Sequence, residues 1–177
     1  MSSPSVGSVD NLCISGTHTH SAPAGFLTHT IFQVTSLGWV HQTYEAFSTG
    51  IANAVIKANA NLRDGRAFIT TGEVDGANIN RSPTAYTFNP AEERARYNGD
   101  TDTEMTLLKF VADNEEQTPI GMVNWYAVHG TAMNNTNKLV SGDNKGLASY
   151  LFEKKMNGDG ILAGEGDFVA AFAAVSW

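Results

Sequence analysis

The residues best suited to metal chemistry are two histidines, His18 and His20, separated by a single residue. Side chains alternate on an extended backbone, so this spacing directs both imidazoles to one side of the chain. The apolar residues 11–15 before them predict a strand that ends near the pair, and a loop rich in Gly, Ser and Pro follows. Imidazoles held at the end of a rigid element can bind a divalent cation, although the pair can also be two surface histidines.

A third histidine, His129, also follows a predicted strand and opens the polar loop 131–137. Alone it is typical of a hydrogen-bonded loop histidine. Zinc sites, however, commonly join a close pair of ligands to distant ones that the fold brings in. A shared metal would draw the imidazoles of His18 and His129 to within about 3–4 Å of each other. His29 and His41 have no such placement and are interpreted as structural or surface residues.

Three carboxylates are candidate partners for this chemistry: Glu73, Asp75 and Asp143. Each could orient a metal-bound imidazole or act as a base. Equally, Asp143 could cap a helix, and Asp75 followed by Gly76 is typical of a turn. The sequence contains no nucleophile elbow, no Walker loop and no paired-glycine dinucleotide fingerprint. The residues alone therefore indicate an incomplete divalent-metal hydrolase site.

The elements that would position these residues alternate between helix and strand periodicity. This pattern predicts an α/β fold, with a mixed β-sheet core, flanking helices and long active-site loops. Helices are expected at 42–62 and 143–155, with strands at 66–74, 104–112, 119–128 and 168–175. The segment 25–40 is loop or short helix. The stretch 76–103 is a long loop with one helical turn at 91–95, and its arginines and tyrosines favour a binding role.

Composition excludes several classes of protein. The chain has 177 residues, a net charge of −7 and a pI near 5.1, which argues against a nucleic-acid partner. The single cysteine, Cys13, is expected to be buried in the first strand and gives no disulfide framework. No apolar run is long enough to span a bilayer. Residues 1–10 are rich in Ser and Gly, and we expect them to be flexible and not to form a signal peptide.

Several ordered blocks resemble the neutral ceramidase family. They are the stretches 15–26 (SGTHTHSAPAGF), 74–83 (VDGANINRSP), 89–97 (NPAEERARY), 125–137 (WYAVHGTAMNNTN), 141–146 (SGDNKG) and 168–173 (FVAAFA). Together they cover nearly everything from 11 to 173. The resemblance implies a zinc-dependent amidase of sphingolipid catabolism, which splits ceramide into sphingosine and a fatty acid. Within these motifs His18 and His129 would be zinc ligands. His20 would lie beside the metal or contact substrate, and Arg81 would be an active-site cation near the scissile amide.

The sequence also departs from the family pattern. Gly130 stands where the family usually has proline after the second ligand, which predicts a looser loop and a displaced His129. The family's catalytic serine motif, and its further Glu and Tyr zinc ligands, would follow residue 173, and Ser176 lacks the neighbours of that motif. We therefore expect 11–177 to be a partial catalytic domain, truncated before the nucleophile and belonging to a larger one.

The resemblance implies a membrane surface as the source of substrate, and an extracellular, secretory-pathway or membrane-associated location. Two alternatives stay open: a generic metal-dependent lipid amidase or esterase, and a non-catalytic fragment that binds lipid or a partner through the 76–103 loop.

Overall fold

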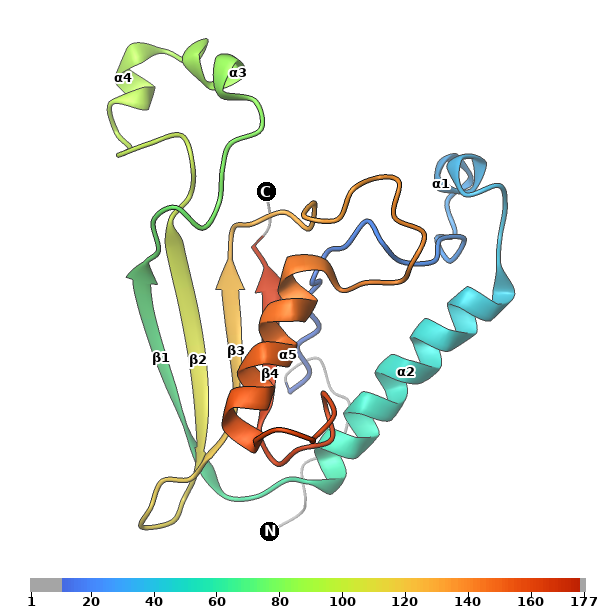
Figure 1. Cartoon of the computed structure of the whole chain (residues 1–177), viewed down its shortest axis with the longest axis vertical. Helices are drawn as coiled ribbons and strands as arrows, with labels where there is room; N and C mark the ends of the chain where they lie inside the picture. The colour runs from blue at the N-terminus through green and yellow to red at the C-terminus, as the bar shows by residue number, and fades with distance from the viewer. Residues whose placement is uncertain (1–10, 176–177) are drawn as a thin grey trace.

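A four-stranded mixed sheet forms the centre of the computed structural model, which describes residues 11–175 (Figure 1). The strands are β1 (Gly65–Glu73), β2 (Glu104–Ala112), β3 (Pro119–Tyr126) and β4 (Val169–Ala174), and they lie in that order. The first three pair antiparallel, and β4 pairs parallel to β3. The mixed α/β fold predicted from the sequence is confirmed. Two expectations concern residues outside the described range: the flexibility of residues 1–10 and the assignment of Ser176.

The connection between the two parallel strands is helix α5 (Asp143–Asn157), because parallel neighbours need a long crossover. Helix α5 and the sheet enclose the core, in which Met122, Phe168 and Ala170 are buried and Leu107, Phe152 and Phe172 pack against them. The rings of Phe152 and Phe168 stack with centroids 5.8 Å apart. This packing fixes the relative positions of β3, β4 and α5.

Polar side chains of α5 tie the helix to the sheet. Glu153 is 5% exposed, and its carboxylate accepts hydrogen bonds from the backbone amides of Ala170 and Gly164. Lys145 is 3% exposed and donates to the carbonyls of Tyr126 and Ala173, at 2.7 and 2.9 Å. Burial lowers the pKa of Lys145. The helix therefore holds the carboxyl ends of β3 and β4 together.

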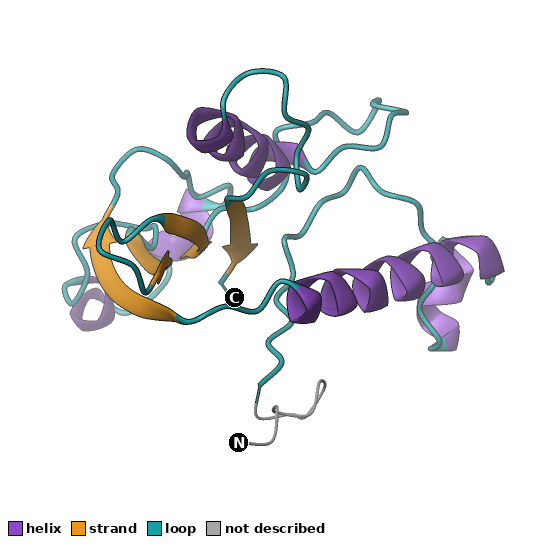
Figure 2. Cartoon of the chain, turned by 90° about the horizontal axis from the view of Figure 1, so that it is seen from below, coloured by secondary structure: helices purple, strands orange, loops and turns teal. Residues whose placement is uncertain are grey.

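The remaining helices contribute no buried residue. They are α1 (Thr30–Thr35), α2 (His41–Ala60), α3 (Pro83–Thr87) and α4 (Ala91–Arg94). Both views show α2 lying apart from the sheet (Figures 1 and 2). Helix α4 is the turn expected at 91–95, whereas α3 in the same long connection was not predicted. None of the helices among residues 11–175 has the length and hydropathy needed to cross a bilayer.

The first predicted strand is wrong. Residues 12–19 have no regular secondary structure, and Cys13, expected to be buried, is exposed. The segment touches the sheet at one end, where the Ala174 amide donates to the Gly16 carbonyl at 2.9 Å. An apolar run forms a strand only when it pairs along its length with the edge of a neighbouring strand. Here β4 makes a single backbone hydrogen bond to the segment.

Candidate metal centre

Three imidazoles from two distant segments converge on one point. The Nε2 atoms of His18 and His20 lie 3.0 Å apart, those of His18 and His129 2.9 Å, and those of His20 and His129 3.1 Å. The expected approach of His18 and His129 is confirmed. The three residues form one group that could hold a metal ion. The different role predicted for His20, beside the metal or in contact with substrate, stays a prediction.

Sheet topology explains how the histidines meet. Strands β3 and β4 are parallel neighbours, so their carboxyl ends reach the same edge of the sheet. His129 follows β3 by three residues, and the end of β4 binds the backbone of Gly16, two residues before His18. Two segments more than a hundred residues apart in sequence therefore lie side by side at this end of the sheet.

The backbone at His18 is not extended, which corrects the alternation argument. His18 has φ +57°, in the left-handed region that residues other than glycine rarely adopt. The imidazoles of His18 and His20 still converge, because the local turn re-aims the first ring toward the second. The His-Thr-His spacing thus identified the right pair through the wrong local geometry.

The loop after His129 is constrained rather than loose. A Cβ atom added at Gly130 would lie 2.1 Å from the carbonyl oxygen of His18. Any side chain at Gly130, in this backbone arrangement, would collide with the segment that carries the first histidine. The predicted displacement of His129 is therefore wrong: the glycine allows the close backbone approach that brings the two ligand segments together.

The donor set fits a cation. Tetrahedral zinc bound by imidazoles, with Zn–N of about 2.0–2.1 Å, needs nitrogens about 3.3 Å apart. The triangle of Nε2 atoms is about 0.3 Å smaller on each side, which small ring rotations can correct. Desolvation lowers the pKa of His129, and His18, His20 and Arg81 lower it further. A lowered pKa favours the neutral imidazole, which is the form that binds metal.

Arg81 lies on the segment between β1 and α3, close enough for its charge to act on His129. Its guanidinium joins no ion pair with a carboxylate between residues 11 and 175. The catalytic role predicted for Arg81 stays a prediction.

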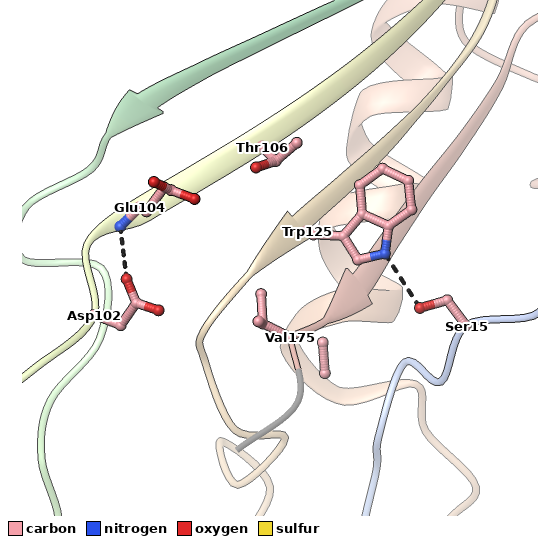
Figure 3. Close-up of a pocket in the computed structure, with 7 residues that line it drawn as sticks. Ser15, Asp102, Glu104, Thr106, Trp125 and Val175 are labelled. Atoms are coloured by element: carbon pink, nitrogen blue, oxygen red, sulfur yellow. Dashed lines mark hydrogen bonds between the residues drawn. The ribbon is translucent and has the colours of Figure 1, made fainter.

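The carboxylates considered as partners lie in other surroundings. Glu73 and Asp75 line a hollow of about 810 Å³, together with Asp100, Asp102 and Glu104. A second hollow of about 320 Å³ lies between the ends of β2, β3 and β4, where the indole of Trp125 donates to the hydroxyl of Ser15 (Figure 3). Neither hollow is lined by the three histidines.

Asp143 does not cap α5, because the N-cap is Gly142. Its carboxylate instead accepts hydrogen bonds from backbone amides of the turn after His129. Sequence analysis also missed Asn144 and Lys145, which hold the carbonyls of His129 and Tyr126. The signal available was a run of polar residues, 143–145, at the start of a helix that packs on the sheet.

Comparisons with known proteins place the chain among neutral ceramidases. The family model of neutral/alkaline non-lysosomal ceramidase, N-terminal, matches residues 4–177. Neutral ceramidase of Drosophila pseudoobscura pseudoobscura is 50% identical over 93% of this chain, and neutral ceramidase B of Dictyostelium discoideum is 47% identical over 96%. The chain spans 23% of the length of each.

A solved structure resembles the fold as well. The neutral ceramidase of Pseudomonas aeruginosa superposes with a TM-score of 0.78 at 37% identity, covering 90% of this chain and 24% of that one. The residues matched by the family model, 4–177, include the sequence blocks that carry all three histidines and Arg81. The chain therefore belongs to the neutral/alkaline non-lysosomal ceramidase family.

Proposed function

We propose that this chain supplies imidazole ligands to a zinc centre that hydrolyses the amide bond of ceramide, giving sphingosine and a fatty acid. One observation carries the proposal: three imidazole nitrogens from two segments lie 2.9 to 3.1 Å from one another in a member of the ceramidase family. Nitrogen lone pairs brought this close repel one another unless a proton or a cation lies between them.

The chain's own residues have distinct parts in this proposal. His18 and His129 would hold the metal, and His20 would contact the metal or the substrate. Bound zinc would polarise the amide carbonyl and lower the pKa of water. Arg81 would hold negative charge that develops on the amide oxygen, since a fixed guanidinium stabilises an oxyanion. A membrane surface is the proposed source of this two-chain lipid.

Metal binding tests the centre directly. Competition with a chromophoric chelator should show zinc binding to the purified chain that is lost in His18→Ala and His129→Ala. The matched control is His41→Ala, because His41 is an exposed histidine paired with Glu45 on α2. Equal zinc affinity in the wild type and both ligand variants would reject the metal centre. His20→Ala should lose less affinity if His20 contacts substrate.

Turnover tests the reaction. The chain is incubated with zinc and a fluorescent ceramide, and release of the labelled fatty acid is followed. Hydrolysis that disappears in Arg81→Gln and His129→Ala would support the amidase. The Arg81 variant is informative because glutamine keeps hydrogen-bonding capacity and removes the charge.

A second candidate is binding of lipid without turnover through the 76–103 segment. Ile79 and Phe88 on this segment are 90% and 84% exposed, and Arg81 lies between them in sequence. Exposed apolar side chains beside a cation suit a lipid with a polar head. Retained ceramide binding with no hydrolysis would favour this candidate, and an Ile79→Ser, Phe88→Ser double variant should then weaken binding.

A further inference from the structure

The turn before α5, residues 141–144, contacts both segments that carry the histidines. On the side of His18 and His20, the Ser141 amide donates to the Ser21 carbonyl at 2.8 Å. The Thr19 hydroxyl donates to the Ser141 carbonyl, also at 2.8 Å. Thr19 lies between the two histidines, so the turn holds the backbone of that pair from one side.

Asn144, at the other end of the turn, holds the third histidine. Its side-chain amide donates to the carbonyl oxygen of His129 at 2.8 Å. The Oδ1 atom of Asn144 is buried and accepts no hydrogen bond within residues 11–175. Among the described residues, the side chain of Asn144 therefore makes its hydrogen bond to the backbone that carries the third histidine.

Asp143 holds the chain just after His129. The residue is 6% exposed and adopts φ +54°, in the left-handed region, which Asp enters more often than most residues other than glycine. Its two carboxylate oxygens accept hydrogen bonds from the amides of Ala132 and Met133, at 3.0 and 3.1 Å. Its own amide donates to the Ser141 hydroxyl at 3.0 Å. An uncommon backbone conformation here aims the carboxylate at the turn that follows His129.

We infer that Asn144 and Asp143 are positioning residues for the metal centre: the 141–144 turn holds His129 against His18 and His20. This inference rests on the proposed metal centre. Neither residue need touch the cation, because each acts on backbone that carries a ligand. Groups that orient ligands in this way commonly change metal affinity about 10–100-fold when they are removed.

The test compares two asparagines of one helix. Asn144→Asp removes the donor to His129 with little change in size. Asn157→Asp makes the matched change at the opposite end of α5, where Asn157 bonds both backbone groups of Phe168. An acidic residue suits a helix N-terminus and disfavours its C-terminus, so the control should harm folding at least as much.

Cobalt(II) serves as the probe, with affinity measured by titration and site geometry by its visible absorption. We expect Asn144→Asp to weaken cobalt binding about tenfold and to alter the absorption bands. Asn157→Asp should bind within twofold of the wild type. Equal losses in both variants, or no loss in Asn144→Asp, would overturn the positioning role.

A second measurement needs no metal. Nuclear Overhauser contacts between the His18 and His129 rings should be present in the metal-free wild type and lost in Asn144→Asp. Asp143→Asn should accelerate hydrogen exchange at the Ala132 and Met133 amides. Unchanged ring contacts and exchange would reject the inference. If instead wild-type protein binds no cobalt but these changes occur, the proposed metal centre fails, and only the hold of the 141–144 turn on the histidine segments is supported.

Discussion

Two halves of this molecule differ sharply in how they are held together. The packed half is β2, β3, α5 and β4, and the open half is α1 and α2. Within residues 11–175, every fully buried apolar side chain lies on or next to β2, β3 or β4, whereas α1 and α2 contain no buried residue. Because His129 follows β3 and the segment that carries His18 is bonded through Gly16 to the end of β4, the position of the histidine cluster depends on the packed half.

This difference indicates that the positions of the three histidines depend on the small hydrophobic core between α5 and the sheet. His18 and His20 are exposed, and their positions come from backbone contacts rather than from burial of the rings. Changes in the packed half should therefore reach the metal centre, and equivalent changes in the open half should not. Matched substitutions in the two halves test that contrast.

The largest effect is expected from removing a core ring. Phe168→Ala should lower the free energy of unfolding by about 3–5 kcal/mol, because Phe168 is 5% exposed and stacks on Phe152. Phe47→Ala on α2 should cost below about 1 kcal/mol, since that ring is 39% exposed. Chemical denaturation measures both, and similar values would remove the distinction between the halves.

A methyl group at Gly130 should break the site with less damage to the fold. Gly130→Ala places a Cβ against the His18 carbonyl, so we expect metal affinity to fall about 100-fold. Gly50→Ala in α2 meets nothing within 4 Å and should stabilise that helix by up to about 1 kcal/mol. Isothermal titration with zinc would contradict this account if Gly130→Ala bound like the wild type.

The buried lysine gives an intermediate effect. Lys145→Met leaves the Tyr126 and Ala173 carbonyls without their donor and should cost about 2 kcal/mol. Lys57→Met on α2 removes an exposed donor to the Gly164 carbonyl and should cost below about 0.5 kcal/mol. Thermal unfolding compares the pair, and a larger loss at Lys57 would mean that α2 is anchored more firmly than its exposure indicates.

The smallest effect should come from the ion pair at the outer strand. Arg66 and Asp113 lie 2.6 Å apart but are both about half exposed. A double-mutant cycle with alanine should give a coupling below about 0.5 kcal/mol, because solvent screens such pairs. A coupling above about 1 kcal/mol would show that β1 is tied to the sheet by charge as well as by its backbone ladder.

Much of the fold could be predicted from the sequence because local signals were strong. The bounds expected for β2, 104–112, agree with the structure, and α5 ends before Gly158, whose φ is +94°. Apolar runs between clear turn residues predict such elements well. Residues 11–15 carried an equally apolar run and formed no strand, because pairing depends on a neighbouring edge that no local pattern records.

For the histidine cluster, too, the sequence determined one part and the tertiary structure the other. Residue types and family motifs, both readable in the sequence, determined that imidazole nitrogens were available and which of the five histidines lie in family motifs. Only the tertiary structure decided that His18, His20 and His129 meet, that Gly130 permits the approach, and that Asp143 faces the 131–133 turn instead of capping its helix. The physical reason is that a side chain's chemistry is local, whereas convergence depends on the parallel pairing of β3 with β4 and on backbone contacts between segments more than a hundred residues apart.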